Sequence, residues 1–471
     1  MVTVAALSIA PIGPAARASS ASAPAGLPPG SRLMVLAPHE DDETLATGQL
    51  IAAARQQGLA VKVVFVTGGD GFSRAAKAES GGGRPTAADY LALAAERRKE
   101  AIAATTALGL SQADVVFLGY PDLGLKEMLL RHWTVDDPYR SDFTGSTRSP
   151  YPDSYRPQAP YAGQALLTDL EGLIAAFRPT VIAAPHPGDV HTDHWATAVF
   201  TQIAVMRLQA AGKLPAPGPL VLGYVVHAGP WPYPPWSAPD LPLPPPQSLA
   251  ATSTRWVIRP GGPVERGRKA LAIAGYRSQL RVAGDYLSSF ARTNEFLGAG
   301  RTLTAARVDR PPATEADWRE LPVAVANPWT GAALGHRPAR PDWSQARLAW
   351  DGRRLHFRLQ LTSRPRRPAE YRVYVYLPAV LEGEGGSPAA AGPATASRME
   401  VRIRVGVGAS SATLTDPDRG TVRPLPVGTG PDGRSVWSSL ELTGQPFPFY
   451  IGFEGPEGTA EAGPATWSLV R

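Results

Sequence analysis

The chain has 471 residues, 44% of them hydrophobic and 19% charged, values typical of a globular protein with more than one domain. Its 47 basic and 41 acidic residues give a net charge of +6, and no Lys/Arg block is interleaved with aromatic residues, so no nucleic acid partner is expected. The sequence has no cysteine, which excludes disulfides and cysteine-bound zinc and leaves His, Asp and Glu as metal ligands.

The N-terminus is a short apolar run followed by small residues, and residues 16–18 (Ala-Arg-Ala) and 21–23 (Ala-Ser-Ala) both fit a signal-peptidase site. We interpret residues 1–28 as a leader, an incomplete secretory signal because no basic segment precedes it. A secreted or extracytoplasmic protein is therefore expected, and a disordered leader on a cytoplasmic protein is the alternative. No apolar stretch of about 20 residues occurs elsewhere, so no transmembrane span is expected.

From Arg32 onward, short apolar runs alternate with longer helical patterns, which is typical of a parallel sheet with crossover helices. The predicted strands are residues 32–37, 61–67, 114–118, 180–184 and 220–226. The predicted helices are residues 45–57, 87–108, 163–177, 194–211, 264–280 and 283–297. Residues 29–308 are therefore predicted to form a Rossmann-like α/β domain, a mostly parallel sheet with helices on both faces.

Two long irregular segments interrupt this pattern, residues 120–160 after the third predicted strand and residues 228–247 after the fifth. Loops of this length in a compact domain are usually functional or disordered. Ligands of open α/β sheets bind beyond the carboxyl ends of the strands, so both segments are expected to form the rim of a substrate site.

After about Arg310, apolar residues recur at every second position, the spacing typical of β-strands. Residues 346–361 show the alternation and the central Asp-Gly turn of a β-hairpin, and residues 371–377 and 399–405 repeat the alternation. Residues 382–397, rich in Gly, Ala and Pro, are expected to form a flexible loop. Residues 315–471 are thus predicted to be an all-β sandwich. The hairpin is faintly similar to carbohydrate-binding modules, and a packing role is the alternative.

One imidazole and four carboxylates follow the first predicted strand, in the order His39, Glu40, Asp41, Asp42 and Glu43. Clustered carboxylates repel one another in a cleft of low dielectric constant, and a divalent metal ion removes that cost. An acidic first turn of a helix, with Asp42 or Glu43 as a cap, is the structural alternative.

A second cluster follows the fourth predicted strand, where residues 184–194 contain His186, His191 and His194. The spacing of His191 and His194 places them on one face of a helix, unless they diverge at its first turn. Polar residues that merely start a helix, with Asp193 as a cap, are again the alternative. Two such clusters at the ends of two strands of one sheet favour a metal site.

The two clusters together resemble the motifs of the zinc-dependent de-N-acetylases of the PIG-L/LmbE-like family, which include N-acetylglucosaminyl deacetylases. Further matches at family-like positions are Arg97-x-x-Glu100, Leu118-Gly119-Tyr120-Pro121-Asp122, Tyr224-Val225-Val226-His227, Tyr276-x-Ser278-Gln279 and Phe290-x-Arg292-x-Asn294-Glu295. The resemblance extends from about Arg32 to Leu297 and does not include the C-terminal third. Glu40 departs from the family pattern, which usually has proline at this position.

The resemblance implies that His39, Asp42 and His194 ligate one Zn²⁺ ion, a three-ligand set that leaves one position open. It further implies that Asp41 is the general base that accepts a proton from the attacking water. His191 would stabilise the oxyanion or protonate the leaving amine, with Asp193 available to hold its tautomer.

The substrate implied by the family is an N-acetylated sugar or glycoconjugate, which would be hydrolysed to acetate and a free amine. Arg97, Asp122 and His227 are candidate substrate-binding residues on the family pattern, and each has a buried structural role as its alternative. Trp231 is a further candidate because aromatic rings stack on sugars, although an aromatic cluster among prolines also packs loops.

Three other functions were weighed against a deacetylase. A nucleotide-binding enzyme is disfavoured because no glycine fingerprint follows the first strand. A secreted glycan-binding protein with a vestigial metal site has no need of Asp41. A hydrolase of the same family that cleaves a different amide fits the same residues, and iron or cobalt fits the same ligands as zinc.

Overall fold

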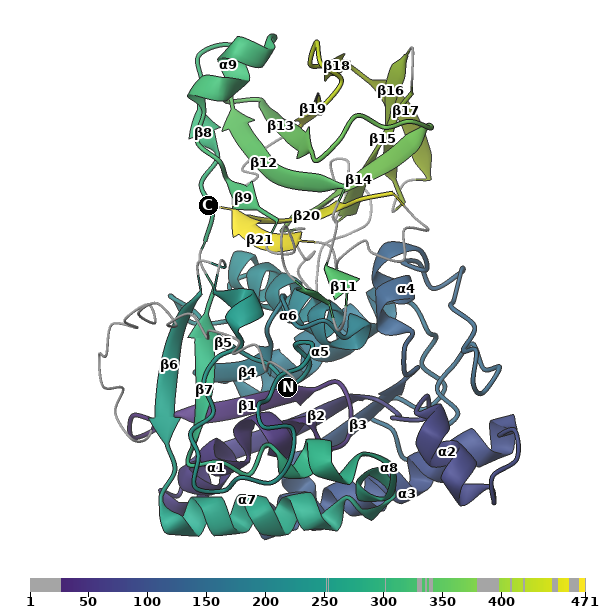
Figure 1. Cartoon of the computed structure of the whole chain (residues 1–471), viewed down its shortest axis with the longest axis vertical. Coiled ribbons are helices and arrows are strands. Elements are labelled where there is room, and N and C mark those ends of the chain that lie inside the picture. Colours follow the sequence, from purple (N-terminus) through teal and green to yellow (C-terminus); the bar gives the residue numbers. More distant parts are fainter. Residues whose placement is uncertain are drawn as a thin grey trace, which may run out of the picture.

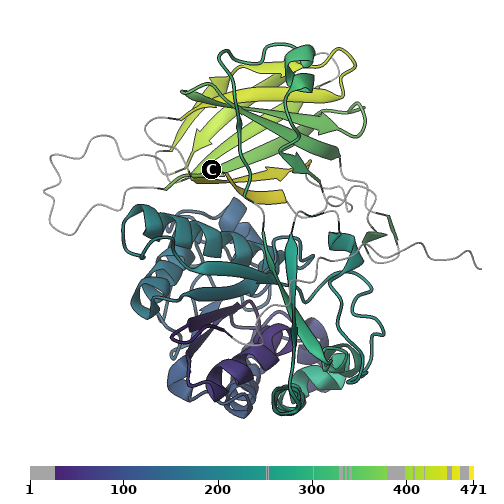
Figure 2. The same ribbon diagram turned by 90° about the vertical axis from the view of Figure 1, so that its left-hand side faces the viewer.

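The computed structural model describes residues 27–250, 252, 254–300, 302–327, 333–334, 337–338, 342–378, 398–406, 409–417, 420–442, 448–456 and 466–470. The predicted leader up to residue 26 and the predicted loop 382–397 lie outside the described residues. Figure 1 shows an α/β domain with an antiparallel β domain against it, and Figure 2 gives the view at a right angle.

The α/β domain is built on a seven-stranded sheet with the order β3-β2-β1-β4-β5-β7-β6. The strands are β1 (Arg32–Ala37), β2 (Ala60–Thr67), β3 (Val115–Tyr120), β4 (Val181–Pro185), β5 (Leu220–Tyr224), β6 (Arg255–Pro260) and β7 (Asn294–Ala299). The first five are parallel, as predicted, whereas β7 pairs antiparallel with both β5 and β6.

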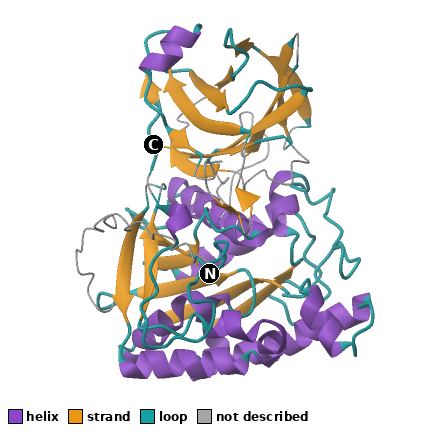
Figure 3. Ribbon diagram, in the orientation of Figure 1, coloured by secondary structure: helices purple, strands orange, loops and turns teal. Residues whose placement is uncertain are grey.

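Helices cover both faces of this sheet, which confirms the predicted fold class (Figure 3). One face packs against α1 (Asp42–Gln56), α3 (Ala87–Ala107), α7 (Pro263–Gly275) and α8 (Arg277–Ser288). The other packs against α4 (Leu125–Leu130), α5 (Gly163–Phe177) and α6 (Thr192–Ala210), and α2 (Ser73–Glu79) contacts α3 and α8. Two 3-10 turns, Gln112–Asp114 and Gln247–Leu249, complete the domain among its described residues.

Alternate side chains of β1 point to opposite faces of the sheet. Leu33 and Val35 belong to the hydrophobic cluster with α1 and α3, while Met34 and Leu36 belong to the cluster with α5 and α6. All four are fully buried. Both faces of a parallel strand are thus apolar, which explains the continuous apolar run in the sequence.

Two helix predictions at the end of this domain were wrong in their bounds. The helix expected over 264–280 ends at Gly275 and a second helix begins at Arg277. The helix expected over 283–297 ends at Ser288, and Asn294 to Leu297 lie in strand β7 instead. A six-residue segment is too short for the spacing of its apolar residues to distinguish a strand from the end of a helix.

The position of β7 depends on a buried ion pair inserted into the hydrogen-bond ladder of α1. Lys269 Nζ donates to the Leu45 carbonyl at 2.7 Å. The Glu295 carboxylate accepts from the backbone N–H groups of Gln49 and Leu50 at 2.8 and 2.9 Å. The ammonium and the carboxylate are 2.9 Å apart, and each side chain is 1% exposed. The pair therefore fastens α7 and β7 to the helix that begins at the predicted metal site.

The C-terminal region consists of antiparallel strands in two six-stranded sheets that share one hydrophobic core. The first sheet contains β8 (Ala306–Arg307), β9 (Val325–Ala326), β12 (Trp343–Trp350), β13 (Arg354–Leu361), β18 (Val427–Thr429) and β19 (Ser435–Glu441), with β8 parallel to β12. The second contains β14 (Ala369–Tyr376), β15 (Arg398–Val405), β16 (Ser410–Asp416), β17 (Thr421–Leu425), β20 (Phe449–Glu454) and β21 (Thr466–Val470).

The predicted hairpin is formed by β12 and β13. Helix α9 (Glu315–Glu320) and the pair β10 (Ala333–Leu334) and β11 (Arg337–Pro338) complete the described elements of this region, the C-terminal β domain.

The outer face of the second sheet packs on the α/β domain. Val373 and Val375 of β14 point into the core shared by the two sheets, whereas Tyr374 and Tyr376 belong to the hydrophobic cluster of α4, α5 and α6. Tyr450 of β20 joins the same cluster. No helix in the described part of the chain is long and apolar enough to cross a membrane.

We expect Glu295→Ala to lower the free energy of unfolding by about 3–5 kcal/mol, because it leaves the Lys269 ammonium buried without its partner. Glu96→Ala is the matched control, since Glu96 pairs with Lys99 on the surface at 49% and 74% side-chain exposure. Its effect should stay below about 1 kcal/mol. Urea unfolding followed by circular dichroism measures both; equal effects would contradict a structural role for the buried pair.

Candidate active site

The polar residues predicted from the sequence meet at the carboxyl ends of the parallel strands. His39 and Asp42 follow β1, and His191 and His194 follow β4, its neighbour in the sheet. Within the sheet, β2 is the neighbour of β1 on one edge, and β4 is its neighbour on the opposite edge. The two clusters therefore flank the topological switch point, where α/β sheets open a crevice.

Three ligand-type atoms form a nearly equilateral triangle. His39 Nδ1 lies 3.2 Å from Asp42 Oδ2, and His194 Nε2 lies 3.1 Å from the same oxygen. The two ring nitrogens are 3.3 Å apart. Atoms that each lie about 2.0–2.1 Å from a tetrahedral zinc ion are about 3.3–3.4 Å from one another. The spacing therefore fits three ligands of one small divalent ion.

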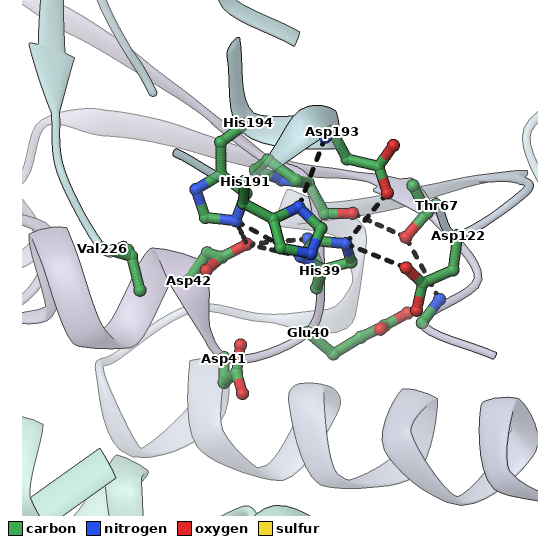
Figure 4. A network of polar contacts seen from close by, with 12 residues as sticks. His39, Glu40, Asp41, Asp42, Thr67, Asp122, His191, Asp193, His194 and Val226 are labelled. Atoms are coloured by element: carbon green, nitrogen blue, oxygen red, sulfur yellow. Dashed lines mark hydrogen bonds and ion pairs between the residues drawn. The ribbon is translucent and has the colours of Figure 1, made fainter. Parts of the chain in front are cut away.

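The remaining ring nitrogens of both histidines contact carboxylates. Figure 4 shows the contacts of His39 with Asp122 and Asp193. His39 Nε2 lies 3.2 Å from Asp122 Oδ1 and 3.3 Å from Asp193 Oδ2. His194 Nδ1 lies 3.1 Å from Asp189 Oδ2. A metal-binding histidine usually donates its second N–H to such a group, which fixes the tautomer and ring orientation. These contacts are the second reason why the residues fit a metal ion.

The electrostatics of the cluster favour bound positive charge. Burial lowers the pKa of His194, but Asp189 and Asp42 outweigh it and raise this pKa to about 10. Burial likewise lowers the pKa of His39, and the carboxylates, Asp122 foremost, hold it well above its usual value. Burial raises the pKa of Asp42, yet the two imidazoles hold it well below its usual range. Such buried carboxylates attract a cation. Three overlapping sets of residues here could hold a metal ion: His39, His191 and His194; Asp42, His194 and His227; and His39, Asp122 and Asp193.

Asp41 caps the N-terminus of α1 in an unusual backbone conformation, with φ at 139°. This conformation costs an L-residue about 1–3 kcal/mol and is typical of functional positions. The Asp41 carboxylate makes no capping hydrogen bond and lines the pocket instead. Burial raises its pKa to about 8, opposed by the Arg97 guanidinium, whose Nη2 lies 3.8 Å away. The N-cap position thus falls on Asp41, and not on Asp42 or Glu43 as the structural alternative had it.

Arg97 holds the segment that precedes α1. Its Nη2 donates to the Glu40 carbonyl at 2.7 Å and its Nη1 to the Gly69 carbonyl at 2.9 Å, while Nε lies 3.6 Å from Glu40 Oε2. Glu40 is 1% exposed, and a Cβ atom at Gly69, where φ is +58°, would collide with its carboxylate. The charge that departs from the family pattern is thus buried, paired with Arg97, and accommodated by a glycine.

His191 and His227 border the triangle in their neutral forms. Burial and the nearby charge of His39 lower the pKa of His191 to about 4, and burial and His194 lower that of His227 to about 3. His191 Nδ1 accepts from the Asp193 backbone N–H at 3.3 Å, so its Nε2 carries the proton. Tyr286 Oη donates to the Val226 carbonyl and lies 3.2 Å from His227 Nδ1, so His227 donates from Nδ1 and its Nε2 is an acceptor.

The Asp193 carboxylate is bonded to segments other than His191. Its Oδ2 accepts from the Leu123 N–H at 2.6 Å and its Oδ1 from the Leu125 N–H at 3.1 Å, while Oδ2 also contacts His39. Asp193 reaches His191 through its backbone N–H, which holds the tautomer of that ring, and not through its carboxylate. Its carboxylate instead orients His39.

A pocket of about 230 Å³ opens beside the triangle. Its lining residues are His39, Asp41, Asp42, Leu45, Gly71, Phe72, Arg97, Asp122, Leu123, His191, Val226, His227, Gln279, Ala283, Tyr286 and Leu287. The first long loop therefore contributes to the rim, as expected, through Asp122 and Leu123. Residues 228–247 are not among the lining residues. Trp231 packs against Phe290 and Phe296, and its Nε1 donates to the Pro244 carbonyl, so this ring packs the loop.

Asp189 and Tyr286 belong to the site although neither had a predicted role. Asp189 is fully buried, and besides His194 its carboxylate accepts from the backbone N–H groups of His191, Val226 and His227. It thereby joins the segments after β4 and β5. The position of Asp189, two residues before His191, could have identified it as part of the site from the sequence. Nothing in the sequence around Tyr286 marks it as a site residue.

Residues 34–205 match the family model described as PIG-L, GlcNAc-PI de-N-acetylase. The matched range contains the three triangle residues together with Asp41 and His191. The match confirms the resemblance to the PIG-L family that the motifs of this part of the chain predict. Among curated protein sequences, none matches the chain.

Solved structures with a similar fold share about a fifth of the aligned residues. The N,N'-diacetylchitobiose deacetylase from Pyrococcus horikoshii is 19% identical, with 57% of this chain and 82% of that chain covered and a TM-score of 0.35. A deacetylase of the teicoplanin biosynthesis pathway is 20% identical, with 57% and 97% covered and a TM-score of 0.37. The 4-carboxy-2-hydroxymuconate hydratase from Pseudomonas putida is 19% identical, with 54% and 82% covered and a TM-score of 0.34. We draw no functional conclusion from similarity at this level.

We expect Asp42→Ala to raise the dissociation constant for Zn²⁺ by more than about 100-fold, because a direct ligand contributes more than the outer partners, whose loss costs 10- to 100-fold. His186→Gln is the control, since the His186 ring follows the same strand as His194 but contacts Thr254 and Trp256. Calorimetric titration of metal-free protein measures both. Unchanged affinity in Asp42→Ala would remove the triangle as the metal site.

Proposed function

We propose that this protein is a zinc-dependent N-deacetylase that hydrolyses the N-acetyl group of an N-acetylglucosamine-containing substrate. The observation that carries the proposal is the triangle of His39, Asp42 and His194 beside the pocket, within the residues that match the PIG-L family model. Two imidazoles and one carboxylate are a frequent catalytic zinc set. Iron and cobalt suit the same donors, so the choice of zinc among these metals rests on the family resemblance.

The ion would supply Lewis acidity, which polarises the amide carbonyl and makes the attacking water more acidic. Asp41 is the residue placed to take a proton from that water, because it lies between His39 and Asp42 in the sequence and lines the pocket. The water oxygen forms a bond to the acetyl carbon, and the C–N bond breaks. The proton held by Asp41 passes to the departing nitrogen, so the products are acetate and a free amine.

His191 stabilises the oxygen of the tetrahedral intermediate in this proposal. Its neutral ring presents Nε2–H as a donor, since Nδ1 is an acceptor from the Asp193 N–H. A fixed donor in a water-poor site stabilises the charge that develops on the carbonyl oxygen. His227 presents the opposite polarity, an acceptor nitrogen, and suits a hydroxyl or amide N–H of the substrate.

The pocket suits a small acyl group held against an apolar wall. Phe72, Leu123 and Leu287 line the pocket together with the polar residues. An acetyl methyl group fits such a wall, and a volume of about 230 Å³ suits one sugar ring more closely than an oligosaccharide. The choice of N-acetylglucosamine rests on the family match alone.

We expect Asp41→Asn to lower kcat by about 10²- to 10⁴-fold, the usual contribution of a general base, with zinc content unchanged. Acetate release from N-acetylglucosamine, its glycosides and its oligomers measures kcat, and elemental analysis measures zinc. Chelated wild-type protein should be inactive and recover with Zn²⁺. Release that persists in Asp41→Asn or in chelated protein would contradict the proposal.

His191→Ala should lower kcat by about 10²- to 10³-fold through loss of one oxyanion donor. KM for the same substrate should change little, because the donor acts on charge that develops after binding. A large rise in KM at constant kcat would instead assign His191 to ground-state binding.

An extracytoplasmic location is also proposed, on the composition of residues 1–23. Cell fractionation, with N-terminal sequencing of the mature protein, tests it; an intact leader in the cytoplasm would reject it. Carbohydrate binding by the C-terminal β domain remains a prediction.

A further inference from the structure

We propose that the C-terminal β domain positions the metal ligand His39 through helix α4. This inference rests on the metal site of the proposed function and not on its substrate. Helix α4 has six residues and spans about 9 Å at 1.5 Å per residue. One of its ends lies against the carboxylates that hold His39, and the other lies against β14 and β15.

The N-terminal end of α4 is bonded to Asp193. The N–H groups of Leu123 and Leu125 donate to the two oxygens of the Asp193 carboxylate at 2.6 and 3.1 Å. The oxygen that accepts from Leu123 also lies 3.3 Å from His39 Nε2. Asp122, which precedes this end of the helix, contacts the same ring nitrogen at 3.2 Å. A shift of α4 would therefore move both carboxylates that orient His39.

The C-terminal end of α4 is capped from the other domain. The last carbonyls of a helix lack partners within the helix and require outside donors. Tyr376 Oη donates to the Leu129 carbonyl at 3.1 Å, and Arg398 Nη2 donates to the Leu130 carbonyl at 2.7 Å. Tyr376 is fully buried and Arg398 is 3% exposed. Arg131, just after the helix, donates to Tyr374 Oη at 2.9 Å. The β domain thus supplies the cap of this helix.

Close packing makes α4 a stiff connection. Leu125, Met128 and Leu129 are fully buried. The Trp133 ring, which follows the helix, lies 5.4 Å from the Tyr376 ring and 5.7 Å from the Arg398 guanidinium carbon. A tightly packed interior transmits a displacement because it has no free volume to absorb it. The competing interpretation is that the β domain stabilises the fold without any specific effect on the metal site.

The test compares Tyr376→Phe and Arg398→Met, separately and combined, with Arg358→Met. Arg358 is an equally buried arginine of the β domain, but it lies on β13, where it bonds to Glu315 and Gln360. Loss of the α4 cap should raise the dissociation constants for Zn²⁺ and Co²⁺ about tenfold in the combined variant, the lower end of the effect of outer metal partners. It should also alter the visible spectrum of bound Co²⁺. Arg358→Met should destabilise the protein with wild-type affinity and spectrum, and Arg398→Lys should recover part of the affinity.

The coupling must also be visible in the opposite direction. By linkage, an interface that tightens metal binding is itself tightened by the metal by the same factor. Saturation with Zn²⁺ should therefore slow amide hydrogen exchange in β14 and β15 of the wild-type protein more than in Tyr376→Phe. This substitution removes one hydroxyl and keeps the ring, so it remains informative if Arg398→Met fails to fold.

The proposal is overturned if both α4-capping variants bind metal like the wild type, if Arg358→Met weakens binding equally, or if exchange in β14 and β15 is insensitive to metal. A wild-type protein that binds no metal would overturn both this inference and the proposed function. Metal binding coupled to the β domain without acetate release would reject only the proposed activity.

Discussion

The shared contact of His39 and His194 with one oxygen of Asp42 is the interaction on which the rest of the site depends. Both rings are buried, and each presents a second nitrogen to further carboxylates. So much negative charge at low dielectric constant is stable only when protonated imidazoles or a bound cation offset it. The cluster forms at the switch point between β1 and β4. These two adjacent parallel strands are far apart in the sequence, and their carboxyl ends lie at the same edge of the sheet.

The outer partners of this cluster recruit segments far apart in the sequence. Asp189 joins the loop after β4 to the backbone of His227 after β5. Arg97, from α3, fixes the backbone around Asp41, whose strained conformation is maintained only by such surroundings. Through Asp193 the cluster reaches α4 and hence the β domain. The second domain is therefore part of the structure that surrounds the candidate metal ligands, and the outer face of its second sheet is covered by this contact.

Much of the fold was predictable because its signals are local. Strands buried on both faces appear as continuous apolar runs, and hairpins of the β domain appear as alternation around an Asp-Gly turn. Strand β7 was missed because its identity depends on a distant ion pair: Glu295 is bound by Lys269 and by the backbone of α1, and no local period records that contact. The same limitation applies to the site, where Tyr286 was missed and where Trp231, a candidate for substrate binding, packs its own loop and does not line the pocket.

By itself, the sequence determined which side chains lie at the ends of the strands, because their order and spacing along the chain place His39, Asp42 and His194 there under any Rossmann-like arrangement. It also determined that a metal, if present, has imidazole and carboxylate ligands. Only the tertiary structure decided which carboxylate serves which ring: Asp193 turns to His39 rather than to its neighbour His191, and Asp189 takes His194. The reason is physical. Second-layer contacts depend on the direction of a side chain at a helix terminus, and that direction is set by packing against α4 and β5, which lie far away in the sequence.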